Sequence, residues 1–85
     1  MDNATERRNR TRVNNDLHKL PIYHDGLPLS EIDNILGRHG FNALEPAIYC
    51  GASGSCTDKV GPNTYLALSW YKMESGRYEV TAYVS

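Results

Sequence analysis

The segment 64–85 alternates between apolar and polar side chains, and this pattern constrains the fold more than any other feature of the sequence. Every second position in each half of the segment is apolar, at Leu66, Leu68, Trp70, Tyr78, Val80, Ala82 and Val84. Side chains two positions apart lie on the same face of a β-strand. The pattern therefore predicts two strands, over residues 64–73 and 77–85, each with one apolar face.

The register of this hairpin follows from the need to bury both apolar faces on the same side of one sheet. That condition places Trp70 opposite Val80. The other apolar pairs are then Leu68 with Ala82 and Leu66 with Val84. The connecting loop has three residues, 74–76, in which Gly76 takes the left-handed conformation of a bulged hairpin. A two-residue loop would place Trp70 opposite Thr81 and mix the apolar and polar faces.

The opposite face of the hairpin holds the candidate partner-binding residues, which are Tyr65, Tyr71, Glu79, Thr81 and Tyr83. Tyrosine combines a large contact area with few rotatable bonds and a hydroxyl group, and it is enriched in binding sites. Tyrosine also favours strands on its own account, and a helix or a second copy of the chain could cover this face. The sequence thus predicts a face that either binds a partner or is covered.

Residues 30–39 are predicted to form a helix, because signals for its start, its apolar face and its end all occur at the spacing of one helix. Ser30 is the expected N-cap, with Asp33 three residues later as in a capping box. The apolar stripe at helical spacing consists of Ile32, Ile35 and Leu36. Gly40 is expected in the left-handed conformation after the last turn, which returns Phe41 to the helix in a Schellman ending.

The other segments are assigned from local signals. Residues 21–24 and 47–50 are predicted as short strands, each starting at or just after a proline. Residues 51–63 are polar and glycine-rich, and are predicted as a loop that is functional or mobile. Residues 1–16 hold one branched aliphatic residue, which favours a flexible segment. The alternative there is a short helix capped by Asn3.

The 85 residues suffice for one small domain. We predict an α+β fold with a three- to four-stranded, mostly antiparallel sheet, a C-terminal β-hairpin, and the helix 30–39 packed on one face. Residues 1–16 would form a flexible or weakly helical basic segment, and residues 17–85 the folded domain. A domain of this size buries only about 60–65% of the surface of its unfolded chain, which favours binding over catalysis.

Four arginines near the N-terminus offer an alternative function. Arg7, Arg8, Arg10 and Arg12 are candidate phosphate-binding residues for a nucleic-acid partner. Neighbouring carboxylates reduce their field, and the net charge of the chain is −1. The aromatic residues that would stack on bases lie elsewhere in the chain. A solvated basic tail is the other interpretation of this segment.

Cys50 and Cys56 admit several interpretations. They could form a disulfide, bind a metal with His24 or His39, or, in the case of Cys56, act as a nucleophile. Their spacing matches no zinc motif, and no motif places a histidine beside either thiol. We expect two free thiols, with no metal, no cofactor and no catalytic residue, in a protein that is not an enzyme.

The N-terminal residues hold no apolar stretch typical of a signal peptide, and no apolar run is long enough to cross a membrane, so we expect a cytoplasmic protein. In its length, its tyrosine-bearing strands and its lack of a catalytic motif, the chain resembles small inhibitors from phages and mobile elements, including anti-CRISPR proteins. This resemblance implies a non-enzymatic module that occupies the surface of a larger protein or complex. A homodimer through the same face, or a nucleic-acid-binding accessory protein, is the alternative.

Overall fold

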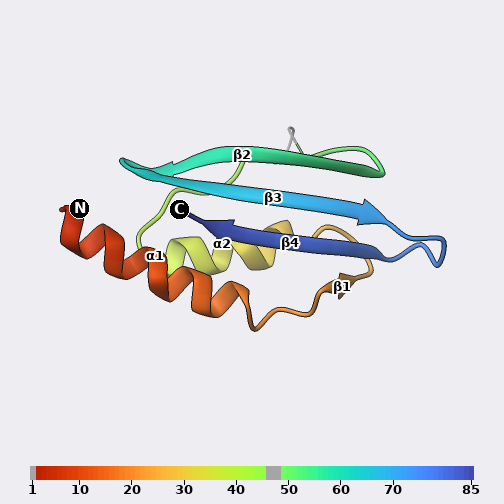
Figure 1. The fold of residues 1–85 in the computed structure, drawn as a ribbon, viewed down its shortest axis with the longest axis horizontal. Coiled ribbons are helices and arrows are strands. Elements are labelled where there is room, and N and C mark those ends of the chain that lie inside the picture. The colour runs from red at the N-terminus through yellow and green to blue at the C-terminus, as the bar shows by residue number, and fades with distance from the viewer. Residues whose placement is uncertain (1, 46–48) are drawn as a thin grey trace.

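The computed structural model describes residues 2–45 and 49–85, and it confirms an α+β fold. The elements in chain order are α1 (Asn3–Leu17), β1 (Tyr23–His24), α2 (Leu29–Arg38), β2 (Ser53–Gly61), β3 (Thr64–Lys72) and β4 (Tyr78–Val84). The strands form one antiparallel sheet in the order β1-β4-β3-β2. In Figure 1, α2 lies behind this sheet and α1 runs alongside β4.

The core lies between the helices and one face of the sheet, which we call the inner face. The inner-face side chains buried there are Val60, Leu66, Leu68, Trp70, Val80 and Val84. The side chains packed against them from the rest of the chain include Val13, Leu17, Ile32, Ile35, Leu36 and Phe41. The predicted packing of the helix 30–39 on the apolar side of the hairpin is therefore confirmed.

The predicted hairpin register is confirmed at every pair. Trp70 lies opposite Val80, and the ladder continues with Leu68 opposite Ala82 and Leu66 opposite Val84. The Met73 N–H donates to the Arg77 carbonyl at 2.8 Å, which closes a three-residue loop. Gly76 has a φ of +90°, the left-handed conformation that this loop requires.

The prediction of a polar loop over residues 51–63 is wrong for most of its length, because residues 53–61 form β2. This strand pairs with β3 and lies at the edge of the sheet, so most of its side chains meet water and need not be apolar. The strand predicted over residues 47–50 is not observed at Tyr49 and Cys50, while Ala47 and Ile48 lie outside the described residues. The strand predicted over residues 21–24 is limited to Tyr23 and His24.

The helix α2 lies one residue earlier at both ends than the predicted range 30–39, and its predicted Schellman ending is confirmed. Its first residue is Leu29, so Ser30 is not the N-cap, and the N-cap position is Pro28 without a side-chain bond. Asp33 instead accepts a hydrogen bond from the Leu44 N–H at 2.8 Å, which orders the chain beyond the helix. At the other end Gly40 has a φ of +83°, and the Phe41 N–H donates to the Leu36 carbonyl at 2.9 Å, as in a Schellman ending.

The N-terminal segment adopts the helical alternative, as α1. Asp2, not Asn3, caps the helix, and it accepts a hydrogen bond from the Thr5 N–H at 2.8 Å. Val13 and Leu17 are buried in the core. This segment therefore packs on the domain that we predicted to begin at residue 17.

The side chain of Asn14 joins α1 to the edge of β4. Its amide donates to the Val84 carbonyl at 3.0 Å and accepts from the Val84 N–H at 2.8 Å. These two bonds reproduce those that a neighbouring strand would make, so Asn14 covers the end of β4 that β1 does not reach.

Replacing Asn14 by alanine should lower the free energy of unfolding by about 1–3 kcal/mol, because both edge-facing groups of Val84 would lose their partners. Urea denaturation measures this change. Asn15→Ala is the matched control, since Asn15 is exposed on the same helix. Equal stabilities of the two variants would contradict the role of Asn14 as an edge cap.

The close contact between the backbone of β2 and the Trp70 side chain of β3 depends on a glycine. Gly54 lies opposite Trp70, and a methyl group at Gly54 would lie 2.8 Å from Cζ2 of the indole ring. The indole N–H also donates to the Gly51 carbonyl at 3.3 Å, which holds the ring in this position. The missing side chain of Gly54 thus makes room for the largest residue of the inner face.

We expect Gly54→Ala to destabilise the protein by about 1–3 kcal/mol through overpacking against Trp70. The control is Gly37→Ala in α2, where nothing lies within 4 Å of the added methyl group. That variant should raise the stability by about 0.5–1 kcal/mol, because alanine favours a helix. If thermal and urea denaturation show Gly54→Ala to be as stable as wild type, the position of the Trp70 ring does not require a glycine at residue 54.

Candidate functional site

The side of the sheet away from the helices, which we call the outer face, presents its side chains to solvent. It consists of Tyr23, Ser53, Ser55, Thr57, Lys59, Tyr65, Ala67, Ser69, Tyr71, Glu79, Thr81 and Tyr83. The exposed fractions of Tyr65, Tyr71 and Tyr83 are 45%, 59% and 50%, whereas that of Trp70 is 5%. Within the described chain, no helix covers this face. All five predicted partner-binding residues therefore lie exposed on one surface.

Two strands that flank β4 place tyrosines on both sides of its only outer-face carboxylate. Glu79 lies opposite Tyr23 of β1 and opposite Tyr71 of β3. Tyr23 is 45% exposed, and it is not among the predicted partner-binding residues. The signal that could have found Tyr23 is its place in the predicted strand 21–24, but the neighbour of that strand in the sheet is not readable from the sequence.

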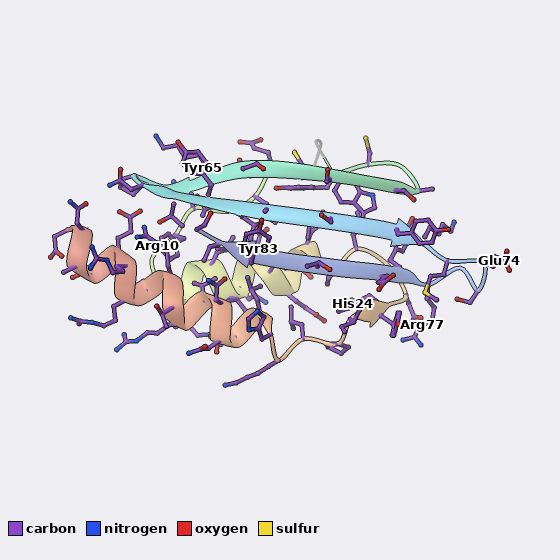
Figure 2. All side chains as sticks on the ribbon, viewed as in Figure 1. Arg10, His24, Tyr65, Glu74, Arg77 and Tyr83 are labelled. Atoms are coloured by element: carbon purple, nitrogen blue, oxygen red, sulfur yellow. The ribbon has the colours of Figure 1, made fainter. Side chains whose placement is uncertain are left out.

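The other two tyrosines lie toward the opposite end of the sheet, where β3 begins and β4 ends (Figure 2). Tyr83 lies opposite Ala67, and Tyr65 lies opposite Lys59. At about 3.3 Å per residue, Tyr65 and Tyr71 start about 20 Å apart along β3. Between them the face has small side chains, Ser69 and Ala67 among them, so its centre is flat.

The outer face is almost free of charge. Its ionisable groups other than tyrosine are one carboxylate, Glu79, and one ammonium group, Lys59. At one end of the sheet, Arg77 donates to the Tyr23 carbonyl at 3.2 Å and lies 3.6 Å from a carboxylate oxygen of Asp25. These contacts hold β1 against β4 at the side where Figure 2 shows His24 and Arg77.

The structure does not gather the four arginines into one site. Arg10 donates to the Asn63 carbonyl at 3.2 Å and to the Thr64 hydroxyl at 3.0 Å, so it holds α1 against the turn between β2 and β3. Arg7, Arg8 and Arg12 are exposed along α1. One of the predicted phosphate-binding residues thus has a structural role.

A buried carboxylate that is not among the predicted site residues binds the same turn. Glu6, only 1% exposed, accepts hydrogen bonds from the Asn63 N–H at 2.8 Å and from the Thr64 hydroxyl at 2.5 Å. Its Oε1 atom has no partner among the described residues. The Thr64 hydrogen bond is the main reason that the pKa of Glu6 lies below its ordinary value, despite desolvation. Glu6 therefore fixes the start of β3, from which Tyr65 projects.

The thiols and histidines lie on different elements of the fold, with His24 on β1 and Cys56 on β2 at opposite edges of the sheet. Cys50 is exposed and Cys56 half-buried, and both are free. The His39 Nε2 atom lies 2.8 Å from a carboxylate oxygen of Asp16, which ties the ends of α1 and α2 together. In the part of the chain that the structure describes, no three His, Cys, Asp or Glu side chains are placed to hold a metal ion.

Comparisons of the chain with protein-family models, curated proteins and solved structures found no match. Neither α1 nor α2 has the length and apolar composition needed to cross a membrane.

The stability of the protein should fall at acid pH partly through Glu6. Its pKa is lowered on folding, so its contribution is complete above the ordinary value of 4.5 and is lost as the pH falls through the lower folded value. In Glu6→Gln this contribution is absent, so the free energy of unfolding should fall less steeply below pH 4.5 than in wild type. Urea denaturation at a series of pH values measures both slopes, and equal slopes would contradict the assignment.

Proposed function

We propose that this protein is a non-enzymatic module that binds a protein partner through the outer face of its sheet. The observation behind this proposal is that tyrosines from three strands lie about half exposed on one uncovered face, while the tryptophan of the same hairpin is buried. Exposed aromatic side chains on a rigid sheet lose little conformational entropy on binding and provide large contact areas.

The chemistry of the face favours a protein over a nucleic acid as the partner. The outer face has one positive side chain, Lys59, and one negative one, Glu79, so it lacks the positive field that phosphates require. Protein interfaces, in contrast, are depleted in charge at their centre and enriched in tyrosine. An inhibitor that blocks a surface of a larger protein is the form of this function that the resemblance to small phage and mobile-element inhibitors implies.

The size of the face indicates how the partner binds. The strands β2 and β3 have nine residues each and are about 30 Å long, and four strands spaced by about 4.8 Å span about 14 Å, so the projected area of the face is at most about 430 Å². A standard interface buries about 800 Å² on each side. We infer that a partner with an interface of this size also contacts an edge of the sheet.

Tyr65→Ser combined with Tyr71→Ser should weaken partner binding by at least about tenfold, because both side chains are exposed anchors. The stability should change little, since neither side chain belongs to the core. The partner is first isolated from the native host by affinity capture at high salt, and its affinity for each variant is then measured by calorimetry. Sedimentation of the chain alone shows whether the partner is a second copy.

Arg8→Ser combined with Arg12→Ser is the matched control on exposed residues of α1. Unchanged binding by the arginine variant and loss by the tyrosine variant would support the outer face. The reverse result, with an affinity that falls steeply with salt, would assign the function to nucleic-acid binding by α1 instead.

A further inference from the structure

The edge of β4 that faces away from β3 is only partly covered. Tyr65 and Ser85 exchange both backbone hydrogen bonds, so the odd-numbered residues of β4 direct their N–H and C=O groups toward β3. The backbone groups of Val80, Ala82 and Val84 therefore point to the other side, where β1 lies.

Two different groups cover the ends of this edge. The Val80 N–H donates to the Ile22 carbonyl at 2.8 Å, and the side-chain amide of Asn14 binds both backbone groups of Val84. Between them, no described residue bonds to the edge-facing N–H and C=O of Ala82. The ladder of β4 thus has a gap that begins at the Val80 carbonyl, which no described residue binds either, and that includes both edge-facing groups of Ala82.

The gap exists because the chain leaves the sheet at a proline. If β1 continued in its register with β4, Leu20 would lie opposite Ala82. Pro21 has no N–H and constrains the residue before it, and the Leu20 N–H donates instead to the Leu17 carbonyl at 3.1 Å. The position beside Ala82 is therefore left without a strand.

A groove of about 450 Å³ occupies this position, which is within the range of sites that bind ligands. Five of its eight lining residues are apolar or aromatic, Leu17, Ile22, Val80, Ala82 and Tyr83, and the other three are His18, Glu79 and Thr81. Ile22 is 56% exposed although it is a large aliphatic residue. The groove adjoins the outer face, because Tyr83 belongs to both.

We propose that this groove receives a short extended segment of the protein partner, which pairs its backbone with Ala82. This inference rests on the proposed function and identifies where the partner crosses the edge of the sheet. The distance from Val80 to Val84 is about 13 Å along the strand, so about three residues fit between the Ile22 and Asn14 bonds.

The register of the gap also defines the side chains of the segment. Residues directly opposite each other in an antiparallel pair point to the same face, and Ala82 points to the inner face. The residue opposite Ala82 therefore inserts its side chain between β4 and Leu17, which requires an apolar group. Its two neighbours point to the outer face beside Thr81 and Tyr83, which suits polar groups. The segment is thus polar–apolar–polar, and its backbone bonds fix it in the manner of strand addition.

The test is an NMR titration of the isotope-labelled full chain with the capped peptide acetyl-Thr-Val-Thr-amide. We expect a saturable shift of the Ala82 amide resonance at millimolar peptide, and slower hydrogen exchange of that amide. The same peptide methylated on the valine nitrogen cannot donate to the Ala82 carbonyl, and it should bind at least about tenfold more weakly. The variant Ile22→Asp should weaken binding of the parent peptide similarly.

The variant with Tyr65→Ser and Tyr71→Ser is the control, because neither residue lines the groove. It should bind the peptide as wild type does. The absence of a saturable shift at Ala82, or equal binding of the methylated peptide, would overturn the strand-pairing proposal. Either result would leave the outer-face proposal intact, because that proposal is decided by the affinity of the partner for the tyrosine variant.

Discussion

Burial of the inner face of β3 is the constraint on which the rest of the structure depends. Leu66 and Leu68 are fully buried, and the helix α2 contributes Ile32 and Leu36, which are also fully buried, to the same core. Since side chains alternate along a strand, burying these residues forces Tyr65 and Tyr71 to the other face. A slip of the register by one residue would bury the tyrosines and expose the leucines, which the apolar helix makes unfavourable.

Polar contacts as well as apolar packing hold the N-terminal helix α1 against the sheet. Glu6 and Arg10 bind the turn before β3, and Asn14 binds the end of β4, so α1 holds both strands of the hairpin at the same end of the sheet. These contacts join residues more than fifty positions apart in the chain. They explain why a segment with so few apolar residues is ordered as a helix.

The predictions that succeeded depend on local or periodic physics. The hairpin register follows from alternation and one turn, and the end of α2 follows from Gly40 and Phe41. The predictions that failed depend on contacts between distant segments or on which residue caps a helix. The strand β2 has the composition of a loop, and only its pairing with β3 makes it a strand. Asp2 caps α1 in place of Asn3, which shows that neighbouring polar residues compete for one cap by small differences in geometry.

The sequence by itself determined which faces of the hairpin are apolar and which hold tyrosine, because a strand has a period of two whatever surrounds it. Only the tertiary structure decided that β1 lies beside β4, that Tyr23 therefore joins Tyr71 around Glu79, and that the edge at Ala82 stays open. These features depend on where Pro21 and the helix α1 direct the chain in space. Periodicity determines the direction of a side chain, whereas the choice of a neighbour depends on packing across the whole domain.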